Sequence, residues 1–124
     1  ILNVENFDTS LAEGVMLLTP FSATGEDEAT VNFVKAYGDA NNGETPNQFA
    51  ADAYDAIYAI KAAMEEAKVT PDMSVTDMGD ALKSAMTKVT IDGLTGDKMS
   101  WSDSGEVNKD PKAVVIENGE YVGM

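Results

Sequence analysis

The chain contains 124 residues, 44% of them hydrophobic and 24% charged, which is enough for one domain with a core and is ordinary for a globular protein. Its formal net charge is −14, and all eight basic residues are lysines. Nucleic-acid affinity rests on cations that neutralise phosphates, so this composition argues against DNA, RNA and anionic membranes as partners. We expect the charge to act mainly as a solubilising surface.

Cysteine, histidine and arginine are all absent. Disulfides, thiol chemistry, Ser–His or Cys–His nucleophiles and zinc sites of the usual kind are therefore excluded within this chain. Without a guanidinium group, any anion must be held by backbone N–H groups, hydroxyls or lysine. We predict no catalysis, no metal and no cofactor. No run of about 18 apolar residues occurs, so no segment is predicted to span a membrane.

The first predicted element is a strand. Residues 14–19 are apolar on both faces, which predicts a buried strand that Pro20 ends. A first helix is expected from about residues 26–28, where acids suit the helix dipole, and Gly38 with the Asn-Gly cluster at 41–43 should end it. Its apolar face recurs at helical spacing and comprises Thr30, Phe33, Val34 and Tyr37.

The strongest periodic signal predicts a second helix, which Thr45 or Asn47 opens and which reaches about Ala67. Apolar residues repeat along it every three or four positions, at Phe49, Ala53, Ile57, Ile60 and Met64. Further alanines fill the positions between them, raise the helix propensity and allow neighbours to approach closely. We expect the repeating residues to form the apolar face that needs a packing partner.

A third helix is predicted over about residues 75–87. The tail is predicted to be β, with a half-buried strand over residues 98–101 and a hairpin over residues 113–122. The hairpin signal is the clearest of these, because Asn118-Gly119 supplies the two positive φ values that a type I′ turn needs.

One strand, three helices and a β tail form an unusual order for a complete α/β domain, in which strands and helices normally alternate. The apolar faces of the helices need a sheet that the sequence does not supply. The chain also begins without Met or a leader. We therefore expect an α/β fragment that missing sequence or another copy completes. The isolated chain is expected to self-associate through its uncovered helix faces.

Several runs of residues follow one another in a familiar order: Glu13–Val15 with Thr19–Phe21, Thr45–Ala56, Asp92–Glu106 and the Asn-Gly-Glu-Tyr-Val close at 118–122. This order resembles the C-terminal third of type I periplasmic binding proteins, and most of all the branched-chain (Leu/Ile/Val) amino-acid-binding family. The resemblance implies that residues 1–23 are the end of lobe 2 and a hinge crossing. It makes residues 24–97 part of lobe 1, and residues 98–124 the return crossing and β-strands of lobe 2.

The resemblance also implies a function. Proteins of this family are non-catalytic, extracytoplasmic components of ABC importers, in the periplasm or as cell-surface lipoproteins, and they deliver a small solute to permease subunits. A branched-chain or other aliphatic amino acid is the expected ligand. Amides, aromatic acids and a ligand-sensing role in a receptor remain open, since one fold serves many ligands.

Candidate ligand-binding residues follow from the same resemblance. The position matching Phe49 often faces the ligand, Ala50 is small enough to line the cleft, and Asp52 could meet an ammonium group. Phe21 and Ser22 lie in the hinge crossing. Each has an ordinary alternative: core packing for Phe49, a solvated first-turn acid for Asp52, and a plain loop for the crossing.

In the family, the groups that hold an amino acid's carboxylate and ammonium precede the stretch that resembles the start of this chain. We therefore expect weak or no binding by the isolated chain. Two other classes stay open. An enzyme would use carboxylates such as Asp52 and Asp55, and an interaction module would use the helix faces. The acids and amides over residues 103–110 lack the spacing of an EF-hand, so no calcium site is predicted.

Overall fold

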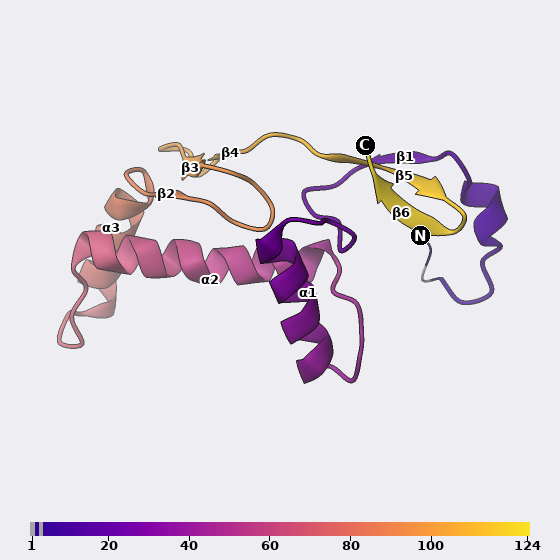
Figure 1. The fold of residues 1–124 in the computed structure, drawn as a ribbon. Helices are drawn as coiled ribbons and strands as arrows, with labels where there is room; N and C mark the ends of the chain where they lie inside the picture. The colour runs from indigo at the N-terminus through magenta and orange to yellow at the C-terminus, as the bar shows by residue number, and fades with distance from the viewer. Residues whose placement is uncertain (1, 3) are drawn as a thin grey trace. The chain divides into compact units, whose positions relative to one another are not determined.

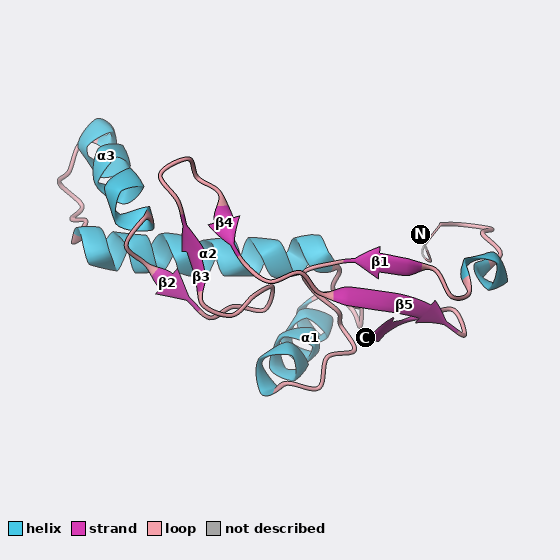
Figure 2. Cartoon of the chain, turned by 90° about the horizontal axis from the view of Figure 1, so that it is seen from above, coloured by secondary structure: helices cyan, strands magenta, loops and turns pink. Residues whose placement is uncertain are grey.

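The computed structural model describes residue 2 and residues 4–124 (Figures 1 and 2). Residues 1 and 3, which belong to the predicted lobe segment 1–23, lie outside the described residues. The elements follow in the order η1 (Thr9–Ala12), β1 (Met16–Leu18), α1 (Glu28–Ala40), α2 (Gln48–Ala67), α3 (Val75–Met86), β2 (Thr90–Ile91), β3 (Met99–Trp101), β4 (Val107–Asn108), β5 (Ala113–Glu117) and β6 (Glu120–Gly123). The predicted order of one strand, three helices and a β tail is confirmed.

The chain divides into two compact units. We call one the terminal unit, which comprises the residues up to Ala50 together with Pro111–Met124. The other is the central unit, Ala51–Asp110. Within the part of the chain that the structure describes, no helix is both long and apolar enough to cross a membrane.

The terminal unit is built on a three-stranded antiparallel sheet in the order β1-β5-β6. Figure 2 shows β1 beside β5. The predicted hairpin is confirmed: Asn118 and Gly119 have φ values of 53° and 76° and join β5 to β6. Along β5 alternate residues are buried, with Val114 3% and Ile116 0% exposed, as expected for a strand with one face toward a core.

Strand β1 departs from the predicted burial. Its side chains Met16 and Leu18 are 67% and 79% exposed, although the strand itself lies where the apolar run predicts it. The reason is the register: Met16 and Leu18 pair with Val115 and Ala113, so their side chains lie on the face of the sheet opposite the buried Val114 and Ile116. The described residues leave both side chains largely uncovered there. An apolar run therefore predicted the strand correctly and its burial in this chain wrongly.

Helix α1 begins within the predicted range of residues 26–28, and Asp27 caps it. The Asp27 carboxylate accepts a hydrogen bond of 2.9 Å from the Thr30 N–H group. That bond lowers the pKa of Asp27 below its usual value. Phe33 is buried and meets the Phe21 ring edge-on, with centroids 5.8 Å apart. Gly38 lies inside the helix rather than at its end, and its carbonyl accepts the closing bond from Gly43.

The central unit contains most of α2, together with α3 and a second three-stranded sheet in the order β2-β3-β4 (Figure 1). The strand predicted over residues 98–101 is confirmed as β3, whereas β2 and β4 are two-residue strands that no periodic signal predicts. Ser74 caps α3 by accepting the Asp77 N–H group at 3.1 Å. Ala85, Val89, Leu94 and Met99 are buried around this sheet.

The buried face of α2 is not the predicted one. Residues at four-residue spacing are buried: Ala51, Asp55, Ala59 and Ala63. The predicted apolar face is instead exposed, with Ile57 at 66% and Ile60 at 49%. Small side chains allow the 93–96 loop to approach the helix closely, and Asp55 binds that loop through hydrogen bonds. A polar anchor and alanines thus decide the orientation of α2.

Candidate functional site

Two of the candidate residues lie in the crossing segment of the terminal unit. Phe21 is only 5% exposed, because its ring packs against Phe33 of α1. Ser22 is half-buried, and its hydroxyl lies 2.8 Å from that of Thr24. Thr24 in turn donates to the Tyr121 carbonyl at 3.1 Å. The crossing segment is thus tied both to α1 and to the C-terminal hairpin.

A hollow of about 390 Å³ opens beside this crossing segment. Its wall brings Thr19, Phe21 and Ser22 together with the returning chain, at Pro111, Lys112, Ala113, Val114, Gly123 and Met124. This volume falls within the range of about 300–1,000 Å³ that is usual for small-molecule sites. The wall offers an apolar surface, two hydroxyls and one lysine. The hydroxyls and the lysine ammonium group can donate hydrogen bonds to a carboxylate.

The start of α2 is tied to the same segment within the terminal unit. The Thr19 hydroxyl lies 2.9 Å from the Phe21 carbonyl oxygen and 3.0 Å from Gln48 Oε1. The Asn47 side chain caps the helix by accepting the Ala50 N–H group at 3.1 Å. Sequence reasoning missed Thr19 and Gln48 as a contact, because a threonine and a glutamine 29 residues apart carry no local signal.

Phe49 and Ala50 follow this cap. The Phe49 side chain is 70% exposed, so its ring is not part of the described core. Ala50 is half-buried. The structure therefore places Phe21, Ser22, Phe49 and Ala50 in one unit and brings the first two to one hollow.

Asp52, the fifth candidate, lies in the central unit. Its Oδ1 is 3.4 Å from Lys109 Nζ, and the side chains are 41% and 24% exposed. Lys109 also donates to the Thr95 hydroxyl at 3.1 Å. An ion pair of this exposure contributes about 0–1 kcal/mol. Asp52 is therefore a carboxylate that already has a cation beside it.

One helical turn further on, Asp55 is 6% exposed and fully hydrogen-bonded. Its Oδ1 accepts the Leu94 N–H group at 2.9 Å, and its Oδ2 accepts the Thr95 N–H and hydroxyl at 2.8 and 2.7 Å. Gly93 is required beside it, because a Cβ there would lie 2.6 Å from the Asp55 carboxyl carbon. Asp55 thus holds the 93–96 loop, and its oxygens are not free to act as a base or nucleophile.

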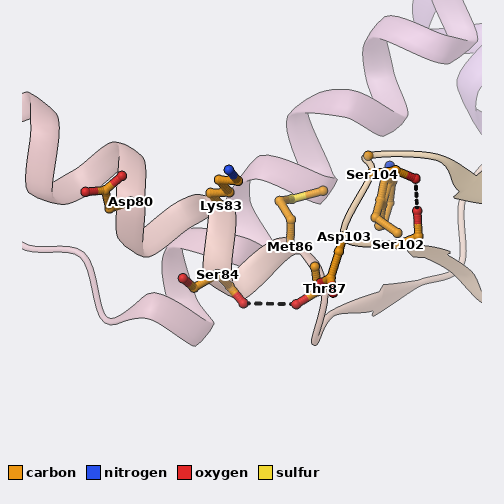
Figure 3. A pocket seen from close by; sticks show the side chains of 10 residues that line it. Asp80, Lys83, Ser84, Met86, Thr87, Ser102, Asp103 and Ser104 are labelled. Carbon is orange, nitrogen blue, oxygen red and sulfur yellow. Dashed lines mark hydrogen bonds between the residues drawn. The ribbon is translucent and has the colours of Figure 1, made fainter.

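A second, larger hollow of about 940 Å³ lies in the central unit between α3 and the turn that joins β3 to β4 (Figure 3). None of the candidate residues lines it. Its hydroxyls bond locally: Ser102 lies 2.8 Å from Ser104, and Thr87 donates to the Ser84 carbonyl at 3.2 Å (Figure 3). Ser104 also donates to Glu106 at 2.9 Å. Among the described residues, no cluster of three or more acids could hold a metal ion.

Comparisons with known proteins agree with this architecture. The sequence matches the family described as periplasmic binding protein over residues 4–120. No match was found among curated proteins. A provisionally assigned branched-chain amino acid ABC transporter from Rhodospirillum rubrum is 25% identical, with a TM-score of 0.68 over 96% of this chain and 35% of that chain.

Two further solved structures show the same fold. An ABC transporter substrate-binding protein from Desulfitobacterium hafniense, in complex with Leu, is 19% identical, with a TM-score of 0.73 over 93% of this chain and 32% of that chain. A solute-binding protein from R. palustris, in complex with benzoate, is 16% identical, with a TM-score of 0.70 over 91% of this chain and 29% of that chain. The chain thus spans about a third of the length of these structures.

Proposed function

Because the chain belongs to the periplasmic binding protein family, we propose that it forms part of a non-catalytic solute-binding component of an ABC importer. The observation that carries this proposal is the family match over residues 4–120, together with the shared fold. The chemistry of the chain supports it as well. Histidine and cysteine are absent, and both oxygens of the buried Asp55 are engaged by the 93–96 loop.

The proposed solute is a small molecule that joins a carboxylate or an amide to an apolar group. A branched-chain or other aliphatic amino acid is the first choice, and an aromatic acid or a small amide is the alternative. The exposed ring of Phe49 supports an apolar contact. The hydroxyls of Thr19 and Ser22 and the ammonium group of Lys112, which line the hollow beside the crossing segment, support a polar one. Leu and benzoate, bound by two proteins of this fold, both carry a carboxylate on an apolar body.

We assign the candidate residues separate roles. Phe49 and Ala50 form an apolar wall, and Ser22 offers a hydroxyl at the hollow that Phe21 helps to line. Asp52 faces the ammonium group of an amino acid while it also forms its ion pair with Lys109. An aromatic acid has no ammonium group, so only an amino acid would depend on Asp52.

The wider role follows from the family. The protein would work outside the cytoplasm, either free in the periplasm or as a lipoprotein, and would hand its solute to permease subunits. Its lobes would close about crossings at residues 19–23 and 99–103, with the lobe boundaries that the sequence predicts.

A thermal-shift screen of the complete gene product against amino acids, small amides and aromatic acids tests the proposal. A ligand that binds only the folded state stabilises it by about 2.7 kcal/mol at a hundredfold excess over its dissociation constant. We expect one of these three chemical groups to raise the melting temperature. No shift with any of them, or consumption of a solute, would contradict the proposal.

A further inference from the structure

The tripeptide Asn-Gly-Glu occurs twice in the terminal unit, at residues 42–44 and 118–120. Asn42 and Asn118 are both exposed, and both have positive φ values, of 55° and 53°. Each is followed by a glycine, which has no Cβ to shield its backbone nitrogen. The two sites are therefore a matched pair in sequence, in solvent access and in the φ value of the asparagine.

An asparagine that precedes a glycine can react with its own backbone. The glycine nitrogen loses its proton and attacks the asparagine Cγ, so that an N–Cγ bond forms, the Cγ–Nδ2 bond breaks and the amide nitrogen leaves as ammonia. Water then opens the five-membered succinimide ring and gives aspartate or isoaspartate. The reaction needs no co-reactant except water, and asparagine is accordingly a thermolabile residue.

At the first site, the attacking nitrogen is held by a hydrogen bond. The Gly43 N–H group donates to the Gly38 carbonyl at 2.8 Å, where the chain leaves α1. The next N–H group, that of Glu44, donates to the Asn41 carbonyl at 3.0 Å. A bonded amide can lose its proton and attack only after the structure opens locally. The closing turn of α1 should therefore protect Asn42.

At the second site, the attacking nitrogen has no such bond. In a two-residue hairpin turn the ladder bonds are made by the flanking residues, here Glu117 and Glu120. Among the described residues, none accepts a hydrogen bond from the Gly119 N–H group. The Asn118 N–H group is held by Glu13 Oε2 at 2.9 Å, but that nitrogen takes no part in the reaction. No backbone hydrogen bond therefore has to open before the Gly119 nitrogen can attack.

From this contrast we infer that Asn118 is a site of spontaneous modification, at which aspartate and isoaspartate form faster than at Asn42. Isoaspartate places one extra carbon in the main chain, so the two-residue turn no longer matches the register that pairs Glu117 with Glu120. Isoaspartate formation at this position therefore weakens the pairing of β5 with β6. The inference does not depend on solute binding, so its failure would leave the proposed function standing.

Peptide mapping of the complete gene product during incubation at mildly alkaline pH tests the inference. Trypsin cleaves after lysine, so Asn42 falls in the peptide 36–61 and Asn118 in the peptide that begins at Ala113. Chromatography with mass spectrometry distinguishes the asparagine, aspartate and isoaspartate forms. In the folded protein we expect Asn118 to react at least about fivefold faster than Asn42, the effect of one hydrogen bond that must open first. Equal rates, a faster reaction at Asn42 or no reaction at Asn118 would overturn the inference.

The same incubation in concentrated urea is the control for the fold. Both sites contain the same tripeptide, so their rates should become similar once the chain is unfolded. A difference of the same size in urea would assign the contrast to the neighbouring residues in the sequence, and it would overturn the inference as well.

The effect on the hairpin has a separate readout. The isoaspartate form, isolated by chromatography, is compared with an Asn118→Asp variant, which carries the same charge on a main chain of ordinary length. We expect the amides of β5 and β6 to exchange hydrogen faster in the isoaspartate form than in the variant. Equal exchange would show that the hairpin accommodates the extra carbon, and it would overturn the inferred weakening of the β5–β6 pairing.

Discussion

The two faces of α2 use opposite chemistry. One face carries alanines and a single acid, Asp55, and it is buried. The other carries large apolar side chains such as Ile57 and Ile60, and it is exposed. The difference shows that the orientation of this helix depends on a specific polar anchor and on close approach to the 93–96 loop, and not on the burial of its largest apolar residues.

Removing the anchor should have the largest effect. Asp55→Ala leaves the Leu94 and Thr95 N–H groups buried without an acceptor, so we expect the free energy of unfolding to fall by about 3 kcal/mol. Asp52→Ala, one turn away, loses only a half-exposed ion pair and should cost about 1 kcal/mol or less. Urea unfolding measures both, and equal losses would mean that Asp55 is not the anchor.

Filling the space beside the anchor should have the next largest effect. The Cβ of Gly93→Ala would meet both the Asp55 carboxyl group and the Met99 methyl carbon at 2.6 Å, so overpacking should cost about 1–3 kcal/mol. Gly79→Ala is the control, because a Cβ on that α3 glycine meets nothing within 4 Å. We expect this second variant to gain about 0.5–1 kcal/mol in a urea titration. A stabilised Gly93→Ala protein would show that the loop does not approach α2 closely.

The Asp27 cap of α1 should make the stability of the terminal unit depend on pH. The pKa of Asp27 is lowered in the folded state by the Thr30 N–H group, so its stabilisation is present above the unfolded pKa and is lost as pH falls through the folded pKa. Asp27→Ala should cost about 1 kcal/mol at neutral pH. Asp27→Asn keeps an acceptor without a titrating group, and it should remove this contribution to acid sensitivity. An unchanged acid-unfolding curve in Asp27→Asn would exclude the cap as a source of that sensitivity.

The smallest effect is expected on the exposed face. Ile57→Ala should change the free energy of unfolding by no more than about 0.5 kcal/mol, because the side chain is 66% exposed. A buried isoleucine truncated in the same way usually costs about 2–5 kcal/mol. Urea unfolding at high dilution measures the change. A loss in the larger range would show that α2 buries this apolar face within the chain.

Local signals in the sequence predicted much of this fold. Helix α1 starts at the acids of residues 26–28, Asn47 opens and caps α2, and Asn118-Gly119 turns the predicted hairpin. These features depend on neighbours within a few residues, so they can be found without the tertiary structure.

Features that depend on distant partners were not predicted. The buried face of α2 is chosen by a loop about 40 residues further along the chain, through Asp55. The only signal was the four-residue spacing of Ala51, Asp55, Ala59 and Ala63, which a search for large apolar residues overlooks. Strands β2 and β4 are two residues long and carry no detectable period. Of the candidate site, the sequence placed Phe49 and Ser22 on their elements but gave no sign of the Thr19–Gln48 contact or of Lys109 beside Asp52.

The central claim is that Phe49 contacts a solute, whereas Ile57, which is nearly as exposed on the same helix, does not. Calorimetric titration of the complete gene product with the solute found by thermal shift tests it directly. Phe49 and Ile57 are 70% and 66% exposed on the same helix, so their alanine variants form a matched pair. We predict that Phe49→Ala weakens binding by at least about tenfold, the loss of one buried apolar contact, and that Ile57→Ala leaves the affinity unchanged. Unchanged affinity in Phe49→Ala, or an equal loss in both variants, would contradict the account.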